Sequence, residues 1–289
     1  MQPRAFEYVR ASTVSQAVGL LEKNGDRAKV LAGGQSLIPL LKLRLAAPEI
    51  LVDIGRIPGL SSIEEVGGTL KIGALVRHRE LERSPLIRDR YPLLADVPKV
   101  LGDPEVRNLG TIGGSLAHAD PAGDWGTALL AFDAKLVAVG PRGERVISGD
   151  DFFRDTFSTA LAPSEILTEI RIPAPASRSG GAYRKLKRKT GDFAIVSVAA
   201  QVALDSADAV GGARLALGAV GPTPVRARRA EASLVGRTAG ESVFAETARI
   251  AAQESRPSSD LHGSETYKRA MVEILTRRAL QAAVERAEG

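Results

Sequence analysis

Two Gly-Gly pairs, each close to a run with helical spacing, constrain the fold of this chain more than any other feature of its sequence. The first pair, Gly33-Gly34, follows the short apolar run 29–32. The second pair, Gly113-Gly114, lies within the glycine-rich run 107–125. Glycine permits a close approach to the backbone and turns that other residues resist. Each pair is therefore either a tight turn or a cradle in which the backbone binds a ligand.

The first 56 residues show the spacing of a small β-α-β unit. Short apolar runs predict strands at 29–32 and 51–54. Leucines at helical spacing between these runs predict a helix, with Ser36 as its N-cap and Pro39 in its first turn. The first Gly-Gly pair would then connect a strand to a helix.

From residue 57 the pattern changes to hairpins mixed with helices. Gly67-Gly68 separates two short alternating runs and predicts a hairpin. Further helices are predicted at 79–90, 93–99, 125–132, 225–234, 241–252 and 264–285, and further strands at 134–139, 144–147, 167–172, 195–204 and 213–220. The stretch 173–181, rich in Pro and Gly, predicts a linker. Strands followed by helices predict an α+β fold with antiparallel strands and a helical cluster.

The composition excludes several kinds of site. The chain has no cysteine, so it cannot form disulfides, thiolate zinc sites or an iron–sulfur cluster on its own thiolates. Its three histidines are dispersed without metal-ligand spacing on a helix, and we expect no metal site. The net charge of +5 permits nucleic-acid binding, but aromatic residues make up only 4% and supply few stacking platforms. We therefore expect no nucleic-acid partner.

The apolar runs of the chain are short. None approaches the length that a transmembrane helix requires. The first residues, MQPRAFEYVRAS, are polar and lack the apolar segment of a signal peptide. We expect a cytoplasmic protein without a transmembrane segment.

Hydroxyl side chains accompany both Gly-Gly pairs. Successive amides in a turn, followed by a helix, form a favourable environment for an anion. Ser36, Thr111 and Ser115 could add hydroxyl donors beside those amides. Two such loops from different segments could bind a diphosphate from both sides, although two simple tight turns remain an alternative. Neither loop has the GxxxxGK[ST] or the GxGxxG pattern of other nucleotide sites.

Four further residues could serve a bound ligand. Asp124 could accept hydrogen bonds from sugar hydroxyls or cap the helix that follows it. His118 has the setting of a hydrogen-bonded loop histidine more than that of a catalytic base. Phe193 could cover a planar ring or belong to a core. Strand alternation would place Lys185 on the face opposite its neighbours, where it could reach an acidic ligand.

The basic run 184–189, which contains Lys185, has two other interpretations. It could be a nucleic-acid patch, or a solvated basic edge strand. The chain has neither a nucleophile elbow with a Ser-His-Asp order nor an HExxH motif. We expect no catalytic residue set in this chain, so that a bound cofactor would supply the chemistry.

The ordered set of motifs resembles a known family. Residues 32–39 (AGGQSLIP), 111–114 (TIGG) and 183–194 (YRKLKRKTGDFA), with 220–224 and 267–269, resemble the FAD-binding medium subunits of molybdenum hydroxylases. Within that family the likeness is to the medium subunits of carbon monoxide dehydrogenases and their xanthine dehydrogenase relatives. It implies an α+β, two-subdomain FAD-binding fold of the vanillyl-alcohol-oxidase (PCMH) type. It also implies an antiparallel-sheet and helix domain at the C-terminus, with domains at 1–56, 57–176 and 177–289.

The same resemblance implies how FAD is held, without a covalent bond. The implied contacts are Leu31, Ala32, Gly33, Gly34, Gln35, Ser36, Leu37, Ile38, Gly110, Thr111, Gly113, Gly114 and Ser115 around the diphosphate, Asp124 at the sugar, and Leu167, Lys185 and Phe193 nearer the flavin. Arg184 remains an alternative to Lys185. Phe193 stands where relatives often have Tyr beside the flavin ring, so a stacking role transfers but a hydroxyl role does not. Gln35 stands where some relatives have His, so the resemblance implies no role for its side chain.

The implied activity is electron transfer within a complex. A large subunit with a molybdenum–pterin centre and a small subunit with two [2Fe-2S] clusters would be the partners, in a dimer of heterotrimers. FAD on this chain would pass electrons to an external acceptor such as a quinone, NAD or oxygen. The absence of cysteine agrees with clusters held elsewhere. A stand-alone flavin oxidoreductase that acts directly on a small substrate, and a basic nucleic-acid-binding module, are the alternatives.

Overall fold

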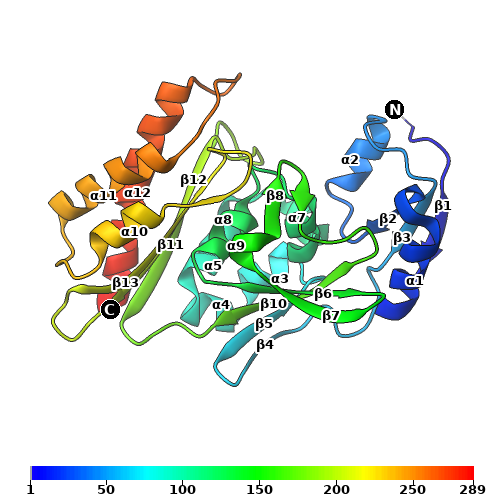
Figure 1. Ribbon diagram of the computed structural model, residues 1–289, viewed down its shortest axis with the longest axis horizontal. Coiled ribbons are helices and arrows are strands. Elements are labelled where there is room, and N and C mark those ends of the chain that lie inside the picture. The colour runs from blue at the N-terminus through cyan, green and yellow to red at the C-terminus, as the bar shows by residue number, and fades with distance from the viewer. Residues whose placement is uncertain (1) are drawn as a thin grey trace.

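The computed structural model describes residues 2–289 and contains three larger sheets, each with its own helices (Figure 1). The three sheets follow one another along the chain, from the N-terminal unit in blue to the C-terminal helices in orange and red. The structure therefore confirms the α+β class. No helix among residues 2–289 combines the length and apolar character needed to cross a membrane.

The N-terminal unit is a small parallel sheet with two α-helices. Its elements are β1 (Glu7–Arg10), α1 (Val14–Asn24), η1 (Gly25–Arg27), β2 (Ala28–Leu31), α2 (Leu37–Lys42) and β3 (Ile50–Asp53). The strand order is β1-β3-β2, and both pairings are parallel. This confirms the predicted β-α-β unit. The strand β1 was not predicted, because Glu7–Arg10 is mostly exposed and carries no apolar alternation.

The middle part joins an antiparallel sheet to a group of short helices. Its elements are β4 (Ile63–Val66), β5 (Thr69–Gly73), α3 (His78–Arg83), α4 (Pro85–Arg90), α5 (Pro92–Val100), α6 (Pro104–Leu109), α7 (Ile112–His118), α8 (Asp124–Leu130), β6 (Lys135–Gly140), β7 (Gly143–Ser148), α9 (Gly149–Phe152), β8 (Phe153–Asp155), β9 (Ser158–Thr159) and β10 (Ile166–Pro173). The order of the large sheet is β4-β5-β10-β6-β7. Trp125 and Tyr91 are the largest side chains buried in its core.

The C-terminal part is a second antiparallel sheet covered by helices. Its elements are β11 (Ser179–Leu186), β12 (Val196–Leu204), β13 (Val210–Gly218), β14 (Val225–Arg226), α10 (Arg228–Leu234), α11 (Glu241–Glu254) and α12 (Glu265–Glu288). The strands follow the order β11-β12-β13-β14, and α12 packs along β11 and β12. A Cβ on Gly180 would lie 2.2 Å from the carbonyl oxygen of Ala283, so glycine permits this close contact.

Several predicted boundaries are wrong for local reasons. The predicted helix 79–90 is two helices, because Ser84 caps a new helix that has Pro85 at its first position. The predicted linker 173–181 is shorter, since β10 extends to Pro173 and β11 begins at Ser179. The predicted helix 225–234 begins with the short strand β14. The glycine-rich run 107–125 contains α7, which the sequence analysis did not predict.

Candidate functional site

The two Gly-Gly pairs lie in loops that contact each other. We call residues 32–37 the first glycine loop and residues 109–115 the second. A Cβ on Gly33 would lie 2.2 Å from the carbonyl oxygen of Leu109 and 2.9 Å from Cα of Gly110. A Cβ on Gly114 would lie 3.7 Å from Cβ of Ala32. The second loop is therefore the neighbour that requires glycine at position 33. Gly34 has a φ of +76°, which other residues rarely adopt.

The first glycine loop presents a row of unpaired backbone donors. The N–H groups of residues 33–37 donate no hydrogen bond to any residue in the described range 2–289. Ser36 occupies the predicted N-cap position of α2, but its side chain makes no capping bond because its backbone is already helical. Its hydroxyl is therefore not engaged at the helix terminus. These residues are half-buried, and successive amides without an acceptor form a row that suits an anionic ligand.

Most backbone N–H groups of the second glycine loop donate hydrogen bonds within the chain. Gly113 donates to the carbonyl oxygen of Ala74 over 2.9 Å, and Gly114 donates to Oγ1 of Thr111 over 3.1 Å. Gly110, Ile112 and Ser115 also donate to carbonyl groups of the chain. A Cβ on Gly113 would lie 2.4 Å from Cβ of Ala74. The expectation that both loops offer amides to a ligand is therefore wrong for these residues, because anchoring of the loop uses their N–H groups.

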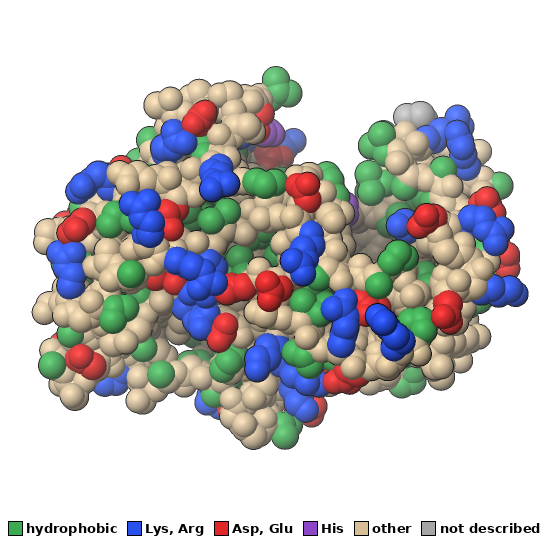
Figure 2. Space-filling model, viewed as in Figure 1, with side chains coloured by type: hydrophobic (Ala, Val, Ile, Leu, Met, Phe, Trp, Pro, Cys, Tyr) green, Lys and Arg blue, Asp and Glu red, His purple; other side chains and the backbone are tan. Residues whose placement is uncertain are grey.

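A hollow separates the N-terminal unit from the rest of the molecule on the face shown in Figure 2. In the same view the helices that follow the two glycine loops, α2 and α7, lie on either side of that space (Figure 1). Leu109 of the second glycine loop and Ile38 of α2 are exposed. The loops thus combine polar backbone with apolar side chains, which is the usual composition of a cofactor site.

A buried ion pair joins the middle part to the C-terminal part. Lys185 of β11 donates from Nζ to Oδ2 of Asp124 over 2.9 Å, with side chains only 1% and 6% exposed. Tyr183, two residues earlier on β11, donates its hydroxyl to Oδ1 of Asp124 over 2.7 Å. Asp124 is the first residue of α8, and Gly123 takes the N-cap position. Asp124 therefore does not cap the helix, which the sequence analysis had left as an alternative.

Burial and charge act in opposite directions on this group of side chains. Burial raises the pKa of Asp124, while the charge of Lys185 and the hydrogen bond from Tyr183 oppose that rise. Because each oxygen accepts from a different donor, the geometry is that of a carboxylate. Burial and the charge of Asp124 raise the pKa of Tyr183 well above its ordinary value. Tyr183 is therefore a neutral donor at physiological pH.

His78, which the sequence analysis did not select, lies beneath the second glycine loop. Its backbone N–H donates to the carbonyl oxygen of Gly110 over 3.0 Å, and its ring is 4% exposed. The indole N–H of Trp125 donates to Nδ1 of His78 over 3.0 Å. Burial, and to a lesser extent the charge of Arg107, lowers the pKa of His78 to about 4. A single histidine at the start of a polar helix does not indicate, from the sequence alone, that its ring is buried against Trp125.

The other predicted residues lie around these features. Leu167 is buried in β10 opposite Ala138 of β6. Phe193 is 61% exposed, so its alternative as a core residue is wrong. Ala194, its neighbour, donates its backbone N–H to the carbonyl oxygen of Ala122 over 3.4 Å. The segment that carries Phe193 therefore lies close to the loop that precedes Asp124.

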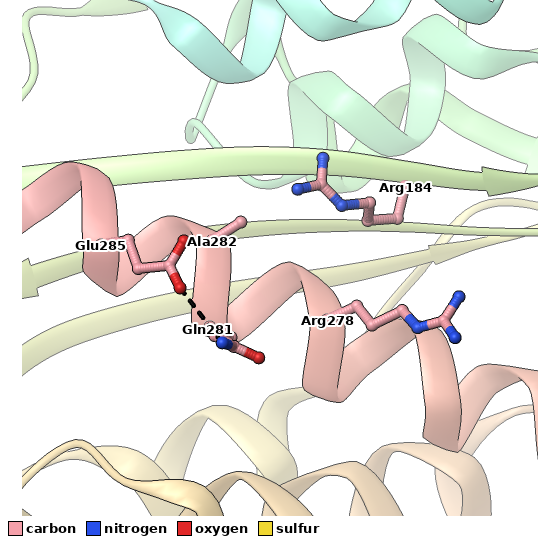
Figure 3. Close-up of a pocket in the computed structure, with 5 residues that line it drawn as sticks. All are labelled: Arg184, Arg278, Gln281, Ala282 and Glu285. Atoms are coloured by element: carbon pink, nitrogen blue, oxygen red, sulfur yellow. Dashed lines mark hydrogen bonds between the residues drawn. The ribbon is translucent and has the colours of Figure 1, made fainter.

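The basic run divides between two faces of β11, as strand alternation predicts. Lys185 points toward Asp124, and Lys187 donates to the carbonyl oxygen of Val100 over 2.9 Å. Arg184 points the other way, into a cavity of about 260 Å³ against α12 (Figure 3). The residues around this cavity are Arg184, Arg278, Gln281, Ala282 and Glu285, and none belongs to a glycine loop. This arrangement favours Lys185 over Arg184 as the residue near a cofactor. Two of the three basic residues at 184–187, Lys185 and Lys187, are not available to a nucleic acid.

Comparisons with known proteins agree with one family over nearly the whole chain. The model of the FAD binding domain in molybdopterin dehydrogenase matches residues 4–175, and that of the CO dehydrogenase flavoprotein C-terminal domain matches residues 181–283. The carbon monoxide dehydrogenase medium chain of Hydrogenophaga pseudoflava is 44% identical, over 98% of both chains. The 6-hydroxypseudooxynicotine dehydrogenase complex subunit alpha of Paenarthrobacter nicotinovorans is 39% identical, over 99% of this chain and 97% of that one.

A solved structure gives the same result. A chain of the carbon monoxide dehydrogenase from Hydrogenophaga pseudoflava superimposes with a TM-score of 0.96 at 45% identity, covering 99% of each chain. The fold, the paired glycine loops and the two matched domains thus point to one function. The chain belongs to the family of FAD-binding medium subunits of molybdenum hydroxylases, and it is the flavoprotein subunit of a multi-subunit oxidoreductase.

Proposed function

We propose that the first glycine loop binds the diphosphate of FAD through the N–H groups of residues 33–37. The observation that carries this proposal is the row of five successive amides that find no acceptor among residues 2–289. A diphosphate offers several anionic oxygens, and backbone amides bind such oxygens without the cost of ordering long side chains. The hydroxyls of Ser36, Thr111 and Ser115 lie on the same two loops and would add donors. The diphosphate would then lie between the proposed domains 1–56 and 57–176.

The unused hydrogen-bond donors of the Lys185 ammonium group support the proposal that this residue lies near the flavin. A lysine has three N–H donors, and Lys185 uses one of them, toward Asp124, among residues 2–289. Its side chain is almost completely buried, so water is a poor partner for the other two. A carbonyl-rich ring would satisfy them once the residues that cover Lys185 make room for it, because the side chain is only 1% exposed. Within this proposal, Asp124 acts through Lys185 rather than by the sugar contact that the resemblance implies, because both of its oxygens accept from this chain. Contacts from Leu167 and Phe193 complete the site.

Bound FAD would supply the redox chemistry, since it accepts electrons from one centre and passes them to another. The residues of this chain bind and orient it. Residues 33–37 hold the anionic part, Lys185 places a positive charge near the ring, and the apolar Leu167 and Ile38 limit access of water. No side chain of this chain is required to form a bond with a substrate.

The proposed partners are an iron–sulfur small subunit and a molybdopterin large subunit, in a dimer of heterotrimers. Two observations support a role in electron transfer rather than in substrate binding. The chain has no cysteine, so the clusters must lie on another subunit. Its two similar relatives carry the names of enzymes for carbon monoxide and for 6-hydroxypseudooxynicotine, although both resemble this chain from end to end. Such different substrates are expected when another subunit recognises them.

The test is the flavin content of the full chain, purified alone and with its co-expressed partners. We expect a yellow protein with flavin absorbance, and reconstitution of the colourless form by FAD. We expect Gly114→Val to lose FAD while the far-ultraviolet circular dichroism stays largely unchanged. The new Cβ would lie 2.8 Å from Oγ1 of Thr111 and 3.7 Å from Cβ of Ala32, so the added side chain would distort the contact between the loops. Gly19→Ala is the matched control, since a Cβ there has no neighbour within 4 Å. A wild-type chain that binds no FAD, or a Gly114→Val variant with full flavin content, would contradict the proposal.

A further inference from the structure

Tyr183 and Lys185 bind the two different carboxylate oxygens of Asp124. Its hydroxyl donates to Oδ1 of Asp124 over 2.7 Å, while Lys185 donates to Oδ2 over 2.9 Å. Tyr183 and Lys185 are two residues apart on β11, so they project from the same face of the strand. One carboxylate therefore receives one hydrogen bond from each of two neighbouring side chains, and each bond fixes one oxygen.

Burial makes the hydrogen bond from Tyr183 important for the position of the carboxylate. Tyr183 is 3% and Asp124 5% exposed, so water does not replace a lost donor. A buried acceptor that loses its donor carries the desolvation cost of that group. The lowest-cost response is for the carboxylate to turn toward its remaining partner, the ammonium of Lys185. Loss of the Tyr183 hydroxyl therefore moves the Asp124 carboxylate. It also changes the position of the Lys185 ammonium and how far the carboxylate neutralises its charge.

We propose that Tyr183 is a positioning residue of the flavin site, which fixes the Asp124 carboxylate and through it holds the Lys185 ammonium toward the flavin. This inference rests on the proposed function, because it requires FAD to lie beside Lys185. It goes beyond the family resemblance, in which Tyr183 only formed part of a motif. The hydroxyl itself is not the group that contacts the cofactor, since its hydrogen bond is already donated to Asp124.

The test is Tyr183→Phe in the full chain, which removes one oxygen atom and keeps the ring in the core. We expect the dissociation constant of FAD to rise by about fivefold or more, because a buried hydrogen bond to a charged group is lost. We also expect the midpoint potential of bound FAD to become more negative. The less compensated Asp124 carboxylate would draw the Lys185 charge away from the flavin. The potential reports the local charge, which a purely structural defect would not shift in this direction.

Tyr91→Phe is the matched control. Tyr91 is also fully buried, and it also donates its hydroxyl to a carboxylate, Oε2 of Glu65, over 3.0 Å. Glu65 lies on the edge strand β4 of the middle sheet, and it pairs with Arg90 and Tyr91, not with Lys185. We expect this variant to keep the affinity for FAD and the potential of the wild type, even if its thermal stability falls.

The outcomes separate the two proposals. A wild-type chain that binds no FAD would refute the proposed function. Normal binding by the wild type, with unchanged affinity and potential in Tyr183→Phe, would refute the role of Tyr183 alone. Equal losses in Tyr183→Phe and Tyr91→Phe would also refute it, since any buried hydroxyl would then have the same effect. Should Tyr183→Phe fail to fold, Asp124→Asn tests the same network, and an unchanged potential in that variant would refute the inference.

Discussion

The indole N–H of Trp125 donates to Nδ1 of His78, and this hydrogen bond fixes the protonation state of a histidine beneath the second glycine loop. Because Nδ1 accepts, the neutral ring carries its proton on Nε2. Protonation of Nδ1 would break the bond and would place a charge in the core. Burial therefore lowers the pKa of His78 to about 4.

His78 predicts a loss of stability in mild acid. In the unfolded chain its pKa is about 6.5, so the unfolded state binds more protons between about pH 4 and pH 6.5. The free energy of unfolding should therefore rise with pH through this window, and the contribution of His78 is complete above pH 6.5. A difference of about 2.5 pKa units corresponds to roughly 3 kcal/mol. Urea unfolding at pH 4.5, 5.5 and 7 measures this slope.

His78→Asn is the comparison for that measurement. Its Oδ1 takes the place of Nδ1 as acceptor for Trp125, but the side chain does not titrate. We expect the variant to be less stable at pH 7, because a smaller side chain leaves a cavity, and to lose less stability than the wild type on acidification. Parallel pH profiles for the two proteins would show that other groups cause the acid sensitivity.

The contact between the two glycine loops predicts the effect of a single methyl group. In Gly33→Ala the new Cβ would lie 2.2 Å from the carbonyl oxygen of Leu109, and this backbone atom cannot rotate away. We expect the loops to separate, with a loss of about 1–3 kcal/mol in stability from overpacking. The affinity for FAD should fall by about tenfold or more, since 1.4 kcal/mol corresponds to a factor of ten. Thermal unfolding and flavin fluorescence titration measure the two effects.

Gly19→Ala again provides the control for Gly33→Ala. Gly19 lies in α1 with open space around its Cβ position, so alanine should stabilise the helix by about 0.5–1 kcal/mol. If Gly33→Ala kept the melting temperature and the FAD affinity of the wild type, the loops would have to be able to separate without cost.

The buried ion pair predicts that removal of the lysine costs much stability and that a second substitution, at the aspartate, restores part of it. Lys185→Met leaves the carboxylate of Asp124 buried without its cation, which typically costs about 3–5 kcal/mol. The double variant with Asp124→Asn should recover much of that loss, because it removes the uncompensated charge. Denaturant unfolding of the single and double variants measures the coupling.

An exposed pair shows the contrast with this buried one. Arg27 and Glu49 lie 3.4 Å apart, with side chains 58% and 65% exposed. We expect Arg27→Met to change the free energy of unfolding by less than about 1 kcal/mol. Equal effects of Arg27→Met and Lys185→Met would mean that burial does not determine the strength of the Lys185–Asp124 pair.

The sequence predicted the elements whose signals are local. Period-2 and helical spacing identified most strands and helices, and the pairing of β2 with β3 follows from a short parallel unit. The strand alternation of the basic run also predicted that Lys185 and Arg184 face opposite sides. The shared glycine and hydroxyl pattern of the two loops predicted that both serve one ligand. The structure places the loops against each other, and their binding of a diphosphate stays a prediction.

Features that depend on distant contacts could not be predicted in this way. Tyr183 and Asp124 are 59 residues apart, and nothing in either local sequence indicates that the hydroxyl and the carboxylate meet. His78 depends on Trp125 in the same manner, over 47 residues. The reason for Gly113 was also hidden, since the group that requires glycine is Ala74 of the protein. Tertiary packing, rather than local propensity, determines all three.

The bond between Lys185 and Asp124 also couples binding of the cofactor to the packing of the middle sheet against the C-terminal sheet. These two residues lie on opposite sides of the short connection 174–178, between β10 and β11. A ligand that binds at Lys185 must favour the docked arrangement of the two sheets by the same free energy with which docking favours the ligand. On the proposal that FAD binds beside Lys185, protease cleavage within residues 174–178 should therefore decrease as FAD occupancy rises.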